Sequence, residues 1–111
     1  MRDPLRGEVW MVDLGQPIGH EAGATRPALV VSDDPANAHG LAVMCPITRT
    51  RRGYPTQVEI EQGSSGLDTT SYVQTEQIRT VSTKRLTHRL GMIDSSELSS
   101  VERSLRFLLR L

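Results

Sequence analysis

The hydrophobic pattern of the chain changes period once, near its C-terminal end. Through most of the sequence, short runs of apolar and β-branched residues are separated by Gly- and Pro-rich turns, which is typical of strands. After Asp94, Leu98, Val101, Leu105 and Leu108 recur at spacings of three and four, the period of an amphipathic helix. The pattern therefore predicts a mainly β domain that ends in a helix.

The predicted strands differ in how they are buried. Gln57–Glu61 alternates polar and apolar side chains, as a strand with one wet face does. The continuous apolar run Pro27–Val31 predicts burial on both faces or pairing in a closed barrel. Between the first two strands along the chain, Gly15–Thr25 holds three glycines and a proline and predicts a long flexible loop, a feature that is often functional. The other predicted strands are 7–14, 41–48, 71–81 and a short one at 89–93.

The predicted helix has matching signals at both ends. Asp94 is followed three residues later by Glu97, a capping arrangement. Arg103, Arg106 and Arg110 lie toward the C-terminal end, where cations complement the helix dipole. About five to seven short strands followed by one amphipathic helix predict a small barrel or curled sheet with the helix packed against it.

Length and composition exclude several classes of protein. A chain of 111 residues is most economically one domain, spanning 1–111. It has no run of about 20 apolar residues and no apolar leader after Met1, so we expect a cytoplasmic protein with no membrane-spanning part. One Cys and three His make no metal-ligand spacing, and we expect neither a metal nor a cofactor. We expect Trp10, Cys45 and Phe107 to be core residues.

The formal net charge is zero, which argues against a protein that coats DNA through overall positive charge. One region, residues 35–58, is nevertheless cationic because it has no acidic residue, and it holds Arg49, Arg51, Arg52 and Tyr54. Cations beside an aromatic suit contact with a single-stranded nucleic acid, although a solvated hairpin tip would have the same residues. All but one of the 13 cations are Arg, which suits phosphate recognition or reflects a GC-rich genome.

Two polar residues stand at the ends of buried strands. Arg26 precedes the run 27–31 and Thr48 closes the run 41–48. Pairing of these strands would set a guanidinium beside a hydroxyl, which suits phosphate chemistry. Each residue also has a structural interpretation: Arg26 caps a strand before proline, and Thr48 is a good β-former. Residue type alone favours the structural interpretation for both.

Several short motifs occur in order across nearly the whole chain. They are Arg6-Gly7-Glu8-Val9-Trp10 with Asp13-Leu14, Pro17-Ile18-Gly19-His20-Glu21, Arg26-Pro27-Ala28-Leu29-Val30-Val31-Ser32, Pro46-Ile47-Thr48, Glu76-Gln77-Ile78-Arg79-Thr80 with Arg85-Leu86, and Gly91. Their order and spacing together resemble the MazF/PemK family of toxin endoribonucleases. The resemblance implies an SH3-like β-barrel with helices, a homodimer, and metal-independent, sequence-selective cleavage of single-stranded RNA. It also implies a cognate antitoxin whose tail occupies the RNA groove.

The resemblance implies roles for individual residues. Arg26 matches the family's catalytic arginine, Thr48 its catalytic threonine, and Glu21 a loop acid that affects activity. Glu76 and Gln77 fall where relatives contact RNA bases. The remaining candidates for RNA binding are His20, Arg49, Arg51, Arg52, Tyr54 and Gln74.

The chain departs from the family pattern in two places. Some relatives of the PemK type have an Arg and an Asp at the positions of Gln74 and Glu76, which puts this chain nearer the MazF type. The glycine expected two residues before Arg26 is instead Gly23, one residue earlier. We therefore expect the hinge of the loop to differ.

Cleavage without metal would use the RNA's own 2′-OH as nucleophile and would require stabilisation of a dianionic phosphorane. Arg26 suits this through two N–H donors in fork geometry, and Thr48 can donate to a phosphoryl oxygen or position the 2′-OH. Arginine stays protonated and is a poor base. The proton acceptor therefore stays open between Glu21, Glu76 and His20.

Two other functions stay open. Some toxins that share this barrel inhibit a protein such as DNA gyrase without catalysis, and a plain RNA-binding barrel would hold RNA without cutting it. Neither would need Arg26 and Thr48 together, so the presence of both residues favours the enzyme.

Overall fold

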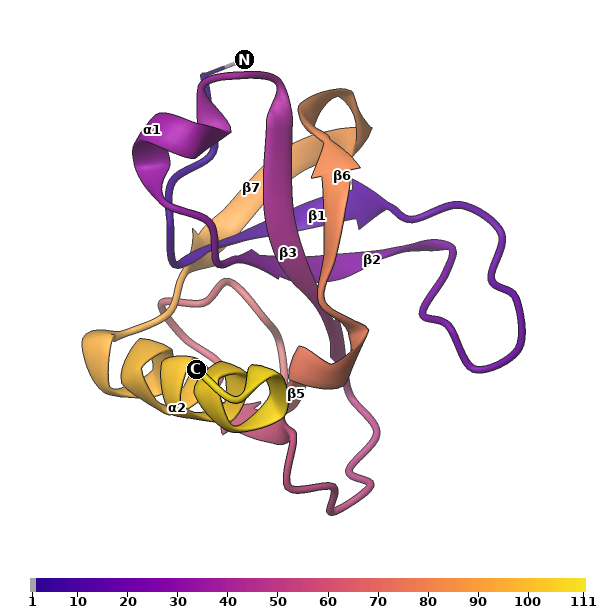
Figure 1. The fold of residues 1–111 in the computed structure, drawn as a ribbon, viewed down its shortest axis with the longest axis vertical. Coiled ribbons are helices and arrows are strands. Elements are labelled where there is room, and N and C mark those ends of the chain that lie inside the picture. The colour runs from indigo at the N-terminus through magenta and orange to yellow at the C-terminus, as the bar shows by residue number, and fades with distance from the viewer. Residues whose placement is uncertain (1) are drawn as a thin grey trace.

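A curled antiparallel sheet carries one long helix along its side in the computed structural model, which describes residues 2–111 (Figure 1). The strands are β1 (Glu8–Asp13), β2 (Thr25–Val30), β3 (Leu41–Thr48), β4 (Gln57–Ile60), β5 (Ser71–Gln74), β6 (Arg79–Ser82) and β7 (Leu86–Met92). The helices are α1 (Asp34–Asn37) and α2 (Ser95–Leu109), with short 3-10 turns η1 (Thr75–Gln77) and η2 (Thr83–Arg85). The predicted mainly β fold with a C-terminal helix is confirmed.

Strand β3 is the centre of the sheet because it pairs with three other strands. Its first half pairs with β6, its middle with β2 and its last two residues with β5. The strand order is β4-β5-β3-β2-β1-β7, with β6 beside β3 and off this path. Within residues 2–111 the end strands β4 and β7 do not pair, so of the two predicted forms, a small barrel or a curled sheet, the structure has the curled sheet. Strand β4 packs against α2 instead.

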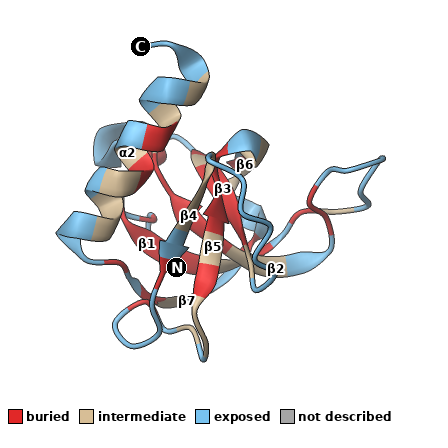
Figure 2. Ribbon diagram, turned by 90° about the horizontal axis from the view of Figure 1, so that it is seen from below, coloured by how far each residue is buried: buried red, intermediate tan, exposed pale blue. Residues whose placement is uncertain are grey.

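Strand β2 is buried on both faces, as its continuous apolar run predicts. Ala28 and Val30 belong to one core, enclosed by β1, β2, β3, β6 and β7. Leu29 belongs to a second core, which includes Cys45 and the fully buried Val101 of α2. Figure 2 shows this burial concentrated in the strands while the connecting loops are exposed. The sheet is therefore fixed from both sides at β2.

Two of the three predicted core residues are confirmed. Trp10 and Cys45 are buried, but Phe107 is 72% exposed. Phe107 lies off the helical stripe that carries Val101 and Leu105, so α2 turns its ring toward solvent.

The predicted strand 71–81 is broken by η1 into β5 and β6. Thr75, at the start of η1, donates its hydroxyl to the carbonyl oxygen of Thr56 and contacts Ser104 Oγ at 2.9 Å. These buried contacts hold the chain at a turn, after which β6 pairs with a different part of β3. Strand β7 also begins earlier than predicted, at Leu86 instead of Arg89.

Helix α2 begins with the predicted capping box. Asp94 Oδ1 accepts a hydrogen bond from Glu97 N at 2.7 Å, and Glu97 Oε1 accepts one from Asp94 N at 3.3 Å. The predicted apolar stripe packs against the second core through Leu98, Val101 and Leu105.

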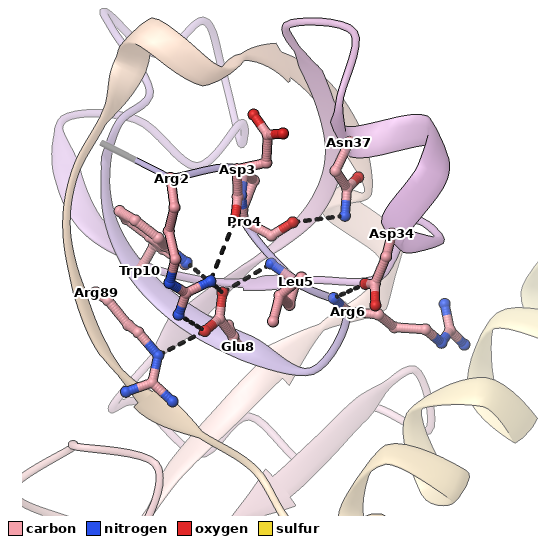
Figure 3. A network of polar contacts seen from close by, with 10 residues as sticks. All are labelled: Arg2, Asp3, Pro4, Leu5, Arg6, Glu8, Trp10, Asp34, Asn37 and Arg89. Atoms are coloured by element: carbon pink, nitrogen blue, oxygen red, sulfur yellow. Dashed lines mark hydrogen bonds and ion pairs between the residues drawn. The ribbon is translucent and has the colours of Figure 1, made fainter.

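A buried carboxylate joins the N-terminal segment to β1 and β7 (Figure 3). Glu8 accepts hydrogen bonds from Leu5 N at 2.7 Å, Trp10 Nε1 at 3.1 Å and Arg89 Nε at 2.6 Å, and it forms an ion pair with Arg2. Burial alone would raise the pKa of Glu8, but these bonds, that from Arg2 foremost, lower it to about 2. Glu8 therefore stabilises the fold as an anion.

Replacing Glu8 by Gln is expected to destabilise the fold by about 3 kcal/mol, because an amide cannot balance Arg2 and Arg89. Since folding lowers the pKa of Glu8 from 4.5 to about 2, its stabilisation is complete above about pH 4.5 and is lost as the pH falls toward 2. Urea unfolding between pH 7 and pH 3 should show a weaker pH dependence for Glu8→Gln than for the unmodified protein.

Glu102→Gln is the matched control, because Glu102 pairs with Arg6 at a more exposed position. It should change the free energy of unfolding by less than about 1 kcal/mol. Equal pH dependence in the unmodified protein and Glu8→Gln would contradict this role of Glu8.

Candidate functional site

The ladder between β2 and β3 brings Arg26 and Thr48 to one cavity. Ala28 of β2 lies opposite Pro46 of β3. Two residues back along β2 and two forward along β3 lead to Arg26 and Thr48, where the ladder opens. Both residues line a cavity of about 270 Å³. The register of two buried strands thus places a guanidinium and a hydroxyl at the same end of the sheet.

The walls of this cavity combine apolar and polar groups. The other lining residues are Met11, Thr25, Pro27, Ile47, Arg49, Leu67, Asp68 and Ser71. Arg26 is half-buried, whereas Arg49 and Asp68 are about three-quarters exposed. Two arginines in such a setting suit an anionic group.

Local hydrogen bonds orient the two side chains. Arg26 Nε donates to the carbonyl oxygen of Gly23 at 3.0 Å. Within residues 2–111 its two terminal nitrogens form no hydrogen bond, so the outer part of the fork remains available. Thr48 Oγ1 accepts a hydrogen bond from Thr50 N at 3.1 Å, which leaves its O–H as a donor.

The loop between β1 and β2 is held at its stem and projects at its tip (Figure 1). Leu14 N donates to the carbonyl oxygen of Ala24 at 2.9 Å, and Ala22 is buried in the first core. Ile18, near the tip, is 79% exposed. The predicted flexible loop is therefore anchored where it meets the site.

Gln77 provides a further anchor for this loop. Its Oε1 accepts a hydrogen bond from Ala22 N at 3.1 Å, and its Nε2 donates to the carbonyl oxygen of His20 at 2.8 Å. Gln77 was expected to contact RNA, and in this conformation its amide positions the loop instead.

The turn at the end of the loop falls on an alanine and not on a glycine. Ala24 stands where a glycine is expected, and it adopts a left-handed conformation with φ 61°, which is unfavourable for a residue with a Cβ. A Cβ on Gly23 would lie 2.5 Å from the ring of Pro17. The glycine at position 23 thus permits close packing inside the loop, while Ala24 bears the strained turn.

Glu21 lies apart from the cavity shared by Arg26 and Thr48. It accepts a hydrogen bond from Ile18 N at 2.9 Å within its own loop, and it does not line the cavity. Neither His20 nor Glu76 lines it either. The carboxylate that does is Asp68, which forms a 3.2 Å ion pair with Arg49.

Most other predicted RNA-binding residues gather around two neighbouring cavities. One, of about 400 Å³, is lined by His20, Arg52, Tyr54, Gln57, Gln74, Glu76 and Gln77. The other, of about 220 Å³, is lined by Arg51, Gly53, Tyr54, Gln57, Glu59 and Tyr72. Tyr54 and Gln57 line both cavities, so the two are adjacent.

These cavities follow one face of the sheet. Tyr72 of β5 lies opposite both Thr48 of β3 and Glu59 of β4, and Gln74 lies opposite Gln57. Residues that face each other across antiparallel strands, and those two positions along, share a face. A polar strip therefore runs from Thr48 across β5 to β4.

Sequence reasoning missed Asp68 and Gln57. Asp68 reaches its place because the loop before β5 packs closely on β7. A Cβ on Gly66 would lie 2.0 Å from Leu90 O, and one on Gly91 would lie 2.2 Å from Ser64 O. Gly91 belongs to the family pattern and was the only signal of this packing. Gln57 lies in a predicted strand, but only its pairing with Gln74 of β5 shows that it belongs to the site.

Other chemistry is limited among residues 2–111. Burial raises the pKa of Cys45 to about 12, so its thiol is unreactive. No cluster of three His, Cys, Asp or Glu side chains in this part of the chain is arranged to hold a metal ion. None of its helices is long and apolar enough to cross a membrane.

Residues 5–109 match the family described as PemK-like, MazF-like toxin of type II toxin–antitoxin system. The chain belongs to this family. It is 38% identical over 108 residues to endoribonuclease MazF9 of Mycobacterium tuberculosis, covering 91% of this chain and 92% of that protein. It is 34% identical over 109 residues to endoribonuclease EndoA of Bacillus subtilis, covering 96% and 94%.

Solved structures of family members have the same fold. The crystal structure of MazF from Deinococcus radiodurans aligns with a TM-score of 0.89 over 100% of both chains, at 27% identity. A mycobacterial endoribonuclease in complex with its cognate antitoxin aligns with a TM-score of 0.81 over 97% of this chain and 96% of that one, at 32% identity. The resemblance predicted from the motifs is confirmed.

Proposed function

We propose that this protein is an endoribonuclease toxin that cleaves single-stranded RNA without a metal ion. Two similar proteins are named endoribonucleases, MazF9 and EndoA. One observation in the structure carries the proposal: Arg26 and Thr48 line the same cavity, where the β2–β3 ladder opens. A guanidinium fork beside a hydroxyl donor suits a phosphodiester.

The proposed reaction uses the RNA's 2′-oxygen as nucleophile. A bond forms from that oxygen to the adjacent phosphorus, and the bond from phosphorus to the 5′-oxygen breaks. The products are a 2′,3′-cyclic phosphate and a 5′-hydroxyl, with one proton taken from the 2′-OH and one delivered to the leaving oxygen. Arg26 stabilises the negative charge on the non-bridging oxygens, and Thr48 donates to one of them or positions the 2′-OH.

We propose Glu21 or Asp68 as the proton acceptor in this scheme. Glu76 accepts hydrogen bonds from Thr56 and Gln57 beside the other cavity, and His20 also lines that cavity. Glu21 matches the family's loop acid and lies on the loop that leads to Arg26. Asp68 lines the cavity, but it is engaged in an ion pair with Arg49. Binding of a phosphate by Arg49 would release the Asp68 carboxylate.

The remaining predicted RNA-binding residues extend the proposed site beyond the scissile phosphate. Arg51, Arg52 and Tyr54 combine phosphate-binding charge with a ring on which a base can stack. We propose that RNA follows the polar strip from Thr48 across β5 to β4. Arg49 holds the phosphate end and Tyr54 the base end.

We also propose that an antitoxin protein covers this face and that the toxin works as a homodimer in the cytoplasm, where its RNA substrate occurs. A similar mycobacterial endoribonuclease has been solved with its cognate antitoxin, and MazF of Deinococcus radiodurans with MazE. The dimer and the blocking antitoxin tail rest on the family resemblance.

Arg26→Ala is expected to lower the rate of RNA cleavage at least about 100-fold, because a preorganised donor to the developing charge is lost. The assay uses purified protein, single-stranded RNA and excess chelator, and it detects 5′-hydroxyl ends by their phosphorylation with a polynucleotide kinase. Arg103→Ala, at an exposed position on α2, is the matched control and should cleave at the unmodified rate.

Cleavage that requires added metal, or an undiminished rate in Arg26→Ala, would contradict the proposal. Tight binding to DNA gyrase without RNA cleavage would favour the non-catalytic inhibitor. Bound but intact RNA would favour a plain RNA-binding protein.

The two candidate proton acceptors can be separated by the pH dependence of cleavage. A carboxylate base must be ionised, so kcat should fall at low pH as the base becomes protonated. If Glu21 is the base, Glu21→Gln should lower kcat and abolish the fall of kcat at low pH, while Asp68→Asn should keep that fall. If Asp68 is the base, the two variants should behave the opposite way. An unchanged fall of kcat at low pH in both variants would exclude both carboxylates.

A further inference from the structure

Two amide side chains lie opposite each other in the wall of the 400 Å³ cavity, and neither donates a hydrogen bond to the oxygen of the other. Gln57 of β4 and Gln74 of β5 are directly opposite in the antiparallel ladder. Gln74 is only 5% exposed, and the Oε1 atoms of both residues are buried without a hydrogen-bond partner. A buried acceptor without a partner costs about 1–3 kcal/mol, so a ligand that donates hydrogen bonds to these two oxygens would be stabilised here.

The orientation of the Gln57 amide is fixed by its neighbour. Gln57 Nε2 donates to Glu76 Oε2 at 2.7 Å, and Thr56 Oγ1 donates to Glu76 Oε1 at 3.1 Å. An ionised carboxylate only accepts hydrogen bonds, so a flipped Gln57 amide would set two acceptors against each other. The atom of the Gln57 amide that has no hydrogen-bond partner is therefore its oxygen, an acceptor.

The polar wall of this cavity consequently favours donors. On the side of β4 and β5 it combines the Gln57 and Gln74 oxygens with the carboxylate of Glu76, while His20 and Arg52 line the cavity from the loops. The Glu76 carboxylate disfavours a phosphate beside these oxygens, whereas two arginines line the cavity of Arg26 and Thr48 together with Asp68. The edge of a base is the part of RNA that carries hydrogen-bond donors, and Tyr54 on the same wall offers a ring for stacking.

We propose that this cavity selects a nucleobase with an exocyclic amino group, and that Gln57 and Gln74 are the residues that select it. An amino group has two hydrogens and can serve both oxygens at once. The last side-chain torsion of glutamine has a broad energy well, so a partial rotation can bring each oxygen toward the base while Gln57 Nε2 keeps its hydrogen bond to Glu76. Adenine, cytosine and guanine carry such a group. Uracil presents a carbonyl oxygen in its place and leaves both acceptors unpaired.

The inference rests on the proposed RNA-binding function and deepens it. Its first test uses an RNA that the protein cleaves, with one amino group removed at a time. Inosine replaces guanosine, purine riboside replaces adenosine, and the 4-deamino analogue replaces cytidine. At one position the loss of the amino group should lower kcat/KM about 10- to 100-fold, and uridine at that position should be cleaved as poorly.

Substitutions of the two glutamines test the assignment. Gln57→Met and Gln74→Met keep similar volume and remove the acceptors, so the discrimination at that position should fall below about 3-fold. Gln62→Met, the same substitution at an exposed position outside both cavities, is the matched control and should keep it. Gln57 is the less buried of the pair, so its variant serves if Gln74→Met fails to fold by thermal melting.

Binding to an uncleavable 2′-deoxy oligonucleotide of the same sequence provides a second readout. Loss of the amino group should weaken the affinity of the unmodified protein for the oligonucleotide. The affinity of the Gln57→Met variant should be the same with and without the amino group. Equal cleavage and binding of every amino-deleted analogue would overturn the inference while leaving the nuclease intact. Amino-dependent binding without any cleavage would instead support the subsite and overturn the proposed enzyme.

Discussion

The register between β2 and β3 is the constraint on which the rest of the site depends. Ala28 lies opposite Pro46 and Leu29 opposite Cys45, and all four residues are buried. Because side chains alternate between faces, a slip of one residue would exchange the two cores and turn Arg26 to the wrong side. Burial of β2 on both faces makes such a slip costly. The apolar packing of β2 and β3 thus sets the positions of Arg26 and Thr48, although these two polar side chains contribute little to that packing.

The polar strip is divided by charge. At one end, Arg26 and Arg49 lie among apolar walls, an arrangement that suits a phosphate. At the other, Glu76 and two glutamine oxygens form a group of acceptors beside His20 and Arg52, and this group suits the donor edge of a base. The division follows from strand alternation, because Thr48, Tyr72 and Gln74 all reach the same face through β3 and β5. Cleavage and base selection can therefore be altered separately.

Much of the fold could be predicted from local pattern, because each signal acts within a few residues. The capping box at Asp94, the burial of Pro27–Val31 and the strand 41–48 are of this kind. Arg26 and Thr48 could be paired only by assuming that their strands are neighbours. The break at Thr75 could not be predicted, since it depends on partners at distant positions in the chain, Thr56 and Ser104.

The parts of the site that escaped prediction depend on contacts between distant segments. Asp68 enters the cavity through the packing of Gly66 and Gly91 on opposing backbone, and Gln77 holds a loop that precedes it by more than 50 residues. A glutamine has the same local signal whether it binds a ligand or a loop. Tertiary structure decides between these roles.

The central claim is that Arg26 and Thr48 act together on one phosphate, and a double-mutant cycle tests it most directly. The rate of RNA cleavage is measured for the unmodified protein, Arg26→Ala, Thr48→Val and the double variant. If the two side chains act as a unit, the double variant should be about as slow as the slower single variant. If the two losses multiply, the residues act independently and the claim is contradicted.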